Sequence, residues 1–176
     1  MTARTIILFS VGYLLALGAA TYFTRPTVRR LVGALAGGVV GGLVVVGAIA
    51  LGEARGWWHV PLVPTPFFLS LLYVGSSISC APVYLVTWRV VRRFGWRGLA
   101  ASLAAAAVIG PPRDYFYAAR FPAWMVFGPG VAPILADAAA YVAFVALGHA
   151  AMRLVAGPAA ADPLVRRSAS AASPAS

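Results

Sequence analysis

Six ionisable residues lie within or beside the apolar stretches of this sequence and could do chemistry. Three carboxylates could act as general acid and base, or could bind a divalent cation, and His59 could shuttle a proton or serve as a ligand. Arg113 and Arg120 could hold the phosphate of a lipid or isoprenoid headgroup through bidentate contacts. The three carboxylates are Glu53, Asp114 and Asp137.

No recognised motif surrounds these candidates. The sequence has no known metal-ligand spacing, no glycine-rich phosphate loop and no nucleophile elbow, so we predict no metal site, and any cofactor is unknown. An ion pair is the alternative interpretation: Asp137 could pair with Arg113 or Arg120 and fix a contact between two helices. The single cysteine, Cys80, excludes an intramolecular disulfide and a cysteine-based zinc site.

Membrane-spanning helices are the elements that must position these residues. The 176-residue chain is 61% hydrophobic and 10% charged, with a mean hydropathy of +0.86. A soluble domain carries about 25% charged residues. The composition therefore excludes a soluble globular domain, a disordered chain and, despite the net charge of +10, a nucleic-acid-binding module.

Five apolar blocks reach or approach the length of about 20 residues that spans a bilayer. We predict an all-α polytopic membrane protein, a five-helix bundle within a single domain of residues 1–156. The fourth block is the shortest, and it spans fully only if Arg97 reaches the headgroups. Residues 157–176, rich in Ala, Ser and Pro, are predicted to form a disordered cytoplasmic tail. The five helices are expected at about 5–23, 31–52, 67–88, 94–112 and 131–155.

The distribution of arginine predicts the orientation. All 14 basic residues are arginines, and five spans would place four of them on one side and ten on the other. The positive-inside rule puts the larger group in the cytoplasm, with the N-terminus outside and the C-terminus inside. The carboxylate candidates then lie at or near the outer face. The ten arginines are Arg25, Arg29, Arg30, Arg89, Arg92, Arg93, Arg97, Arg153, Arg166 and Arg167.

The lack of lysine, together with the abundance of Ala, Gly and Pro, is typical of a GC-rich genome. We therefore interpret the chain as a multi-pass protein of a bacterial cell membrane, in contact with the lipid bilayer and not with nucleic acid.

Glycines at four-residue spacing mark a packing face on the second block. Small residues at this spacing allow two helix backbones to approach closely in lipid. The face could form a homodimer, or it could pack within its own bundle, for example against the alanine-rich fourth block; we favour the second interpretation. The two rows are Gly33, Gly37 and Gly41, and Gly38 and Gly42.

Three functions fit these features. The first is a structural or accessory protein that acts through contacts with lipids or a partner membrane protein. The alternative is an enzyme that acts on a lipid or isoprenoid at the outer interface, using Glu53, Asp114, Asp137 and Arg113 with His59. The third is a transporter, which would need more polar residues along a path through the bilayer.

Overall fold

The computed structural model describes residues 3–61, 68–123, 125–162 and 164, and these are almost entirely helical. The helices are α1 (Ala3–Thr24), α2 (Val28–Arg55), α3 (Phe68–Arg120) and α4 (Ala132–Ala156), followed by the short 3-10 turn η1 (Ala159–Ala161). In the described part of the chain, α2, α3 and α4 are long and apolar enough to span a membrane. The predicted all-α class is confirmed, and the three apolar helices fit a membrane protein.

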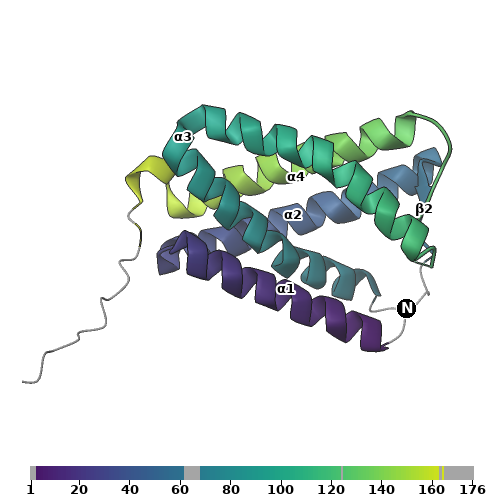
Figure 1. Cartoon of the computed structure of the whole chain (residues 1–176), viewed down its shortest axis with the longest axis horizontal. Helices are drawn as coiled ribbons and strands as arrows, with labels where there is room; N and C mark the ends of the chain where they lie inside the picture. The colour runs from purple at the N-terminus through teal and green to yellow at the C-terminus, as the bar shows by residue number, and fades with distance from the viewer. Residues whose placement is uncertain (1–2, 62–67, 124, 163, 165–176) are drawn as a thin grey trace, which may run out of the picture.

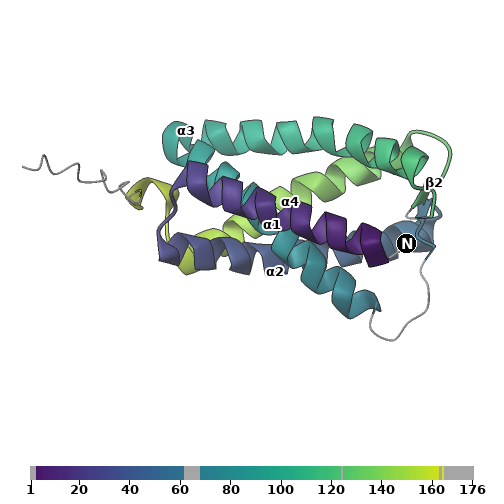
Figure 2. The same ribbon diagram turned by 60° about the horizontal axis from the view of Figure 1, so that its bottom comes forward.

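α3 is a 53-residue helix that reverses direction at Gly95. This residue has φ 60° and ψ −141°, outside the helical region and in a conformation that favours glycine. The arm after Gly95 turns back towards the end of the bundle from which the first arm comes, and the two arms diverge from the reversal (Figures 1 and 2). Residues 89–93, the predicted gap between helices 67–88 and 94–112, are therefore helical, and the break falls at Gly95, inside the predicted fourth helix. Residue 67 lies outside the described residues.

The second arm of α3 extends beyond the predicted end at residue 112. Pro111 and Pro112 lie inside the helix, which ends at Arg120. Proline costs a helix its backbone N–H donor, but its φ of about −65° suits the helical backbone. A contact with α4 holds the added turns, because the Tyr141 hydroxyl donates a hydrogen bond of 2.8 Å to Asp114 Oδ2. Asp114 thus lies on a helix, and the loop predicted there is wrong.

One row of small residues on α2 faces α4. A Cβ atom added to Gly33 would lie 2.8 Å from the Cβ of Ala156, and one added to Gly37 would lie 2.6 Å from the carbonyl oxygen of Gly148. Backbones this close leave no room for a side chain on either residue. Dispersion between the two helices can therefore act over most of their shared length.

The other row faces the first arm of α3. A Cβ atom on Gly38 would collide with the backbone carbonyl of Ser77, and one on Gly42 with the Ser77 hydroxyl. Both rows thus pack within the chain, against α4 and the first arm of α3. The alanine-rich segment 100–107 contributes none of the near neighbours of these glycines in the described structure.

Tyr84 of α3 fills the space that the glycines leave between three elements. Its side chain is fully buried, and its hydroxyl donates a hydrogen bond of 3.1 Å to the backbone carbonyl of Phe144 in α4. The buried ring thus locks the first arm of α3 against both α2 and α4. A Cβ atom added to Gly37, Gly41 or Gly148 would lie within 3.1 Å of the Tyr84 side chain.

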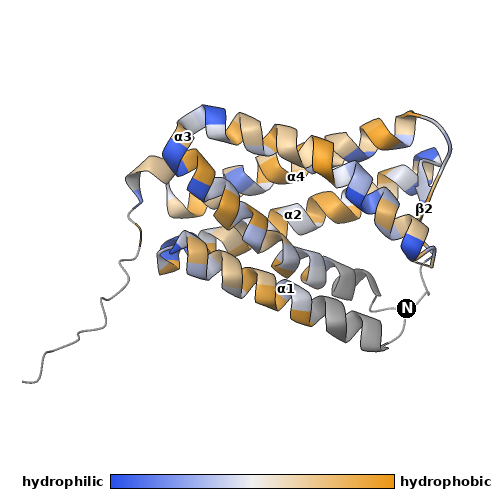
Figure 3. Cartoon of the chain, viewed as in Figure 1, coloured by the Kyte–Doolittle hydropathy of each residue, from blue (hydrophilic) through white to orange (hydrophobic). Residues whose placement is uncertain are grey.

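Two short strands close one end of the bundle, which we term the strand end. β1 (Trp58–His59) pairs antiparallel with β2 (Val126–Phe127), and Gly128 N donates a hydrogen bond of 2.8 Å to the Trp57 carbonyl. The pair joins the segment after α2 to the segment before α4. Apolar residues line the length of the helices, and hydrophilic residues gather mainly towards the two ends (Figure 3).

We predict that Gly38→Ala lowers the free energy of unfolding by about 1–3 kcal/mol, because the added methyl group overpacks the contact with Ser77. Thermal unfolding of the detergent-solubilised protein measures the loss. Gly47→Ala is the matched control, since Gly47 lies on the same helix with nothing within 4 Å of its missing Cβ. The control should be neutral or stabilising by up to about 1 kcal/mol. Equal losses in both variants would contradict the packing role.

Candidate functional site

Asp114 joins the second arm of α3 to α4 near the strand end. Its Oδ1 accepts hydrogen bonds from Arg113 Nε (2.8 Å) and Nη2 (2.7 Å), and its Oδ2 accepts one from the Tyr141 hydroxyl (2.8 Å). The Arg113 guanidinium also lies over the Tyr141 ring, 5.3 Å from its centroid. The neighbour Asp114 therefore neutralises Arg113, and the ion pair expected between Arg113 and Asp137 is absent from the described contacts.

Asp137 is the carboxylate of the predicted site that keeps an unused oxygen. It is buried in α4, and its Oδ2 has no hydrogen-bond partner among the described residues. The Tyr115 hydroxyl and Trp58 Nε1 are likewise buried without a partner there. The Phe127 ring links the last two, stacking on Tyr115 at 4.0 Å and meeting Trp58 edge-on at 6.0 Å. These three groups lie towards the strand end; the other buried polar atoms without a partner among the described residues are Trp88 Nε1 and both ring nitrogens of His149.

Glu53 and His59 form a separate pair at the strand end. Glu53 Oε1 accepts a hydrogen bond of 2.6 Å from the Val60 backbone N–H, and its Oε2 lies 3.1 Å from His59 Nδ1. Both side chains are exposed, so this pair is open to solvent or headgroups. Among the described contacts, no hydrogen bond or ion pair joins Glu53 to Asp114 or Asp137.

The remaining predicted ligand, Arg120, is exposed at the end of α3. It makes no hydrogen bond or ion pair with another described residue. The structure thus brings together Arg113 and Asp114, and separately Glu53 and His59. Within the described residues, no group of three or more His, Cys, Asp or Glu side chains could hold a metal ion.

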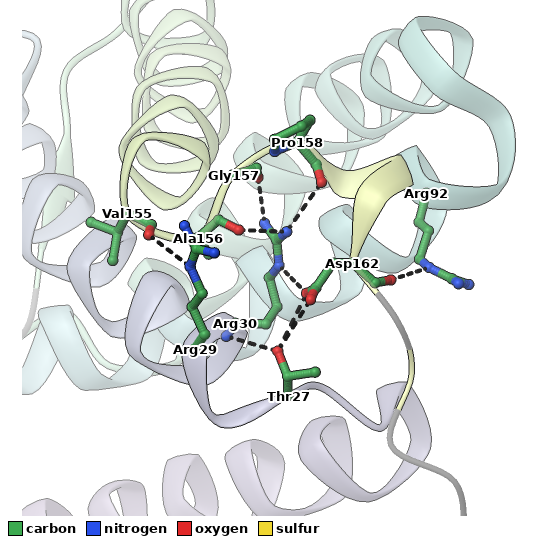
Figure 4. Close-up of polar contacts among 9 residues, drawn as sticks. All are labelled: Thr27, Arg29, Arg30, Arg92, Val155, Ala156, Gly157, Pro158 and Asp162. Atoms are coloured by element: carbon green, nitrogen blue, oxygen red, sulfur yellow. Dashed lines mark hydrogen bonds and ion pairs between the residues drawn. The ribbon is translucent and has the colours of Figure 1, made fainter.

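The most buried charge of the described chain, Arg30, was not predicted as a site residue. Its side chain is fully buried at the start of α2, at the opposite end of the bundle from the strands. Nε donates a hydrogen bond of 2.7 Å to Asp162 Oδ2, and the terminal nitrogens donate to backbone carbonyls at the end of α4 and just after it (Figure 4). Those carbonyls belong to Ala156 (3.2 Å), Gly157 (3.1 Å) and Pro158 (3.4 Å).

These bonds satisfy a helix C-terminus that would otherwise be buried without partners. The last carbonyls of a helix lack intrahelical donors and carry the negative end of its dipole, so a cation there is stabilising. The Thr27 hydroxyl caps α2 by accepting from Arg30 N (3.2 Å) and also contacts Asp162 at 3.3 Å. The Arg30 guanidinium lies 5.3 Å from the centroid of the Trp88 ring.

Residues 157–162 are therefore in contact with the bundle, where a disordered tail was predicted. Residues 163 and 165–176 of that tail lie outside the described residues. One sequence signal could have indicated this contact. Asp162 is the one acidic residue that follows Asp137 in the sequence, and arginines flank it on both sides. Arg92 Nε also donates a hydrogen bond of 2.8 Å to the backbone carbonyl of Asp162.

We term the end of the bundle opposite the strands the basic end. It comprises the turn from α1 to α2, the reversal of α3 and the end of α4, which lie together at the left of Figure 1. The described arginines that fall there are Arg25, Arg29, Arg30, Arg89, Arg92, Arg93, Arg97 and Arg153.

No protein-family model, curated protein or solved structure matches this chain. The class is thus defined by the fold and by the charges: an all-helical protein with three apolar helices long enough to cross a membrane, a strand end with paired carboxylates, and a basic end with an excess of arginine.

We predict that Arg30→Gln costs about 3–5 kcal/mol of unfolding free energy, because it leaves Asp162 and three carbonyl groups without their buried partner. Arg29→Gln is the control. It removes the same charge from the adjacent residue, which is exposed and makes one long contact of 3.4 Å to the Val155 carbonyl. That change should cost less than about 1 kcal/mol. Chemical unfolding in micelles measures both, and a similar cost for the two variants would refute the buried role.

Proposed function

We propose that this chain is a structural or accessory protein of a bacterial cell membrane, which acts through contacts with lipids and a partner protein and not by catalysis. The observation that carries this proposal is that most of its carboxylates bind other groups of the same chain. Of the four acidic residues in the sequence, three bind groups elsewhere in their own chain and so join elements of the fold.

Each of the three carboxylates fastens a different pair of elements. Glu53 ties the end of α2 to the residue after β1, and Asp114 ties α3 to α4. Asp162 ties the segment after α4 to the start of α2. Carboxylates with neighbours bound to both oxygens suit a fixed scaffold better than proton transfer to a substrate, which needs a free oxygen within reach of it.

We further propose that the chain spans the membrane five times. A straight helix of 53 residues would measure about 80 Å at 1.5 Å per residue, far more than the hydrocarbon core of about 30 Å. The break at Gly95 divides α3 into two arms of about 40 Å each, which match a bilayer. With α1, α2 and α4, these arms would make five spans.

The proposed orientation places the basic end in the cytoplasm and the strand end outside. The excess of arginine at one end of the bundle supports this orientation through the positive-inside rule. The N-terminus would then be outside and the C-terminus inside, with Glu53 and His59 at the outer interface.

Single cysteines in a Cys80→Ala background test both statements with a membrane-impermeant maleimide. Ala54→Cys and Ala123→Cys, at exposed positions near the strand end, should label in intact cells. Trp96→Cys and Ala160→Cys, exposed at the basic end, should label only after permeabilisation. If α3 crossed once, Ala54 and Ala123 would lie on opposite sides, and their labelling would differ.

An enzyme that acts on a lipid or isoprenoid at the outer interface is the second candidate. The unpaired, buried Oδ2 of Asp137 favours it, together with the unpartnered Tyr115 hydroxyl on the neighbouring helix. A buried carboxylate near the membrane interface is a default candidate for a functional group. Under this alternative, Asp137 would be the acid or base, and Arg113 would bind the phosphate.

The isosteric variants Glu53→Gln, Asp114→Asn and Asp137→Asn separate the two candidates. For the accessory role, complementation of a deletion strain should fall only in proportion to the amount of folded protein in the membrane. Asp114→Asn should lower that amount most, since it loses an ion pair worth about 1 kcal/mol. Quantitative immunoblotting measures the amount. A variant that accumulates normally but fails to complement would favour the enzyme.

A further inference from the structure

We propose that the basic end binds the phosphate group of an anionic phospholipid, in a cavity at the reversal of α3. The cavity has a volume of about 440 Å³. Its walls come from the last residues of the first arm of α3, just before Gly95, and from one residue after η1. The lining residues are Arg89, Val90, Arg92, Arg93, Phe94 and Leu164.

The three arginines of this cavity have no acidic partner in the described structure. The acidic residue beside them, Asp162, gives its carboxylate to Arg30 at 2.7 Å and turns its backbone carbonyl to Arg92 Nε (Figure 4). Three like charges on neighbouring helical turns repel one another at close range, and a bound anion removes that repulsion. The cavity is thus electrostatically prepared for a negatively charged ligand.

The guanidinium groups suit a phosphate in particular. The bond from Nε to the Asp162 carbonyl, 2.8 Å long, orients Arg92 and leaves its terminal nitrogens to donate elsewhere. Arg89 and Arg93 are exposed, and their side chains make no hydrogen bond with another described residue. Planar guanidinium groups donate pairs of hydrogen bonds that match the oxygens of a phosphate.

The apolar half of the cavity favours a phosphate carried by a lipid over a free one. Val90, Phe94 and Leu164 line it beside the arginines, so a ligand with an apolar part next to its phosphate fills both halves. The Arg93 guanidinium lies 5.3 Å from the centroid of the Phe94 ring. Phe94 and Trp96 are 57% and 76% exposed, which is typical of aromatic residues at a membrane interface. The inference rests on the proposed membrane setting of the accessory protein.

Native mass spectrometry of the purified protein, titrated with phosphatidylglycerol and with phosphatidylcholine, tests the site. The wild type should bind phosphatidylglycerol more tightly. The double variant R89Q/R93Q should lose about 25-fold in affinity for phosphatidylglycerol, at about fivefold per arginine, and should bind phosphatidylcholine as before. Neither side chain makes a hydrogen bond or ion pair with another described residue, and the double variant relieves repulsion between like charges, so the melting temperature should not fall.

The matched control is R25Q/R97Q, which removes two charges from the same end but outside the cavity. It should lose less than about threefold, since neither side chain lines the cavity and an exposed charge outside it is partly screened. Equal losses for both pairs would overturn the site in favour of general attraction to the surface. If millimolar inorganic phosphate displaced phosphatidylglycerol, the proposal that the ligand is a lipid would be overturned. If phosphatidylglycerol stayed bound, that proposal would be supported. Either failure leaves the accessory role to be decided by complementation with the carboxylate variants.

Discussion

The close approach of three helices at α2 is the constraint on which the rest of the structure depends. In a bilayer, lipid tails solvate apolar side chains as well as another helix does, so association relies on dispersion across short distances. The row that starts at Gly33 admits α4, and the row that includes Gly38 admits the first arm of α3. Tyr84 then bridges all three helices with a buried ring and one hydrogen bond. Arg30 lies about one turn before Gly33, so the buried face of α2 also carries a charged side chain.

The two ends of this packed unit differ in how their charges are satisfied. At the strand end, Asp114 pairs with Arg113, Glu53 lies beside His59, and β1 pairs with β2. At the basic end, Arg30 and Asp162 pair deep inside, and the arginines around the reversal of α3 are left without acidic partners in the described chain. Most of the described arginines without an acidic partner thus lie at the basic end.

The sequence predicted those features that depend on composition and local spacing. Apolar blocks located the helices, and the spacing of Gly33, Gly37 and Gly41 identified a packing face. It did not predict the course of α3, because a glycine with positive φ and a proline inside a helix have no clear signature in hydropathy. The pairing of Arg30 with Asp162 joins residues 132 positions apart, and that of Arg113 with its own neighbour depends on side-chain direction. Neither could be read from spacing.

The partners of Arg30 also determine when the molecule can be completed. α2 is synthesised before residues 156–162, whose carbonyls and carboxylate are the partners of its buried guanidinium. Domains form from the N-terminus onward during synthesis. Until residues 156–162 are made, the α1–α2 hairpin carries an unpaired cation at its turn, where water can still solvate it. Docking of α4 and the residues that follow it is thus the step that allows this charge to become part of the core.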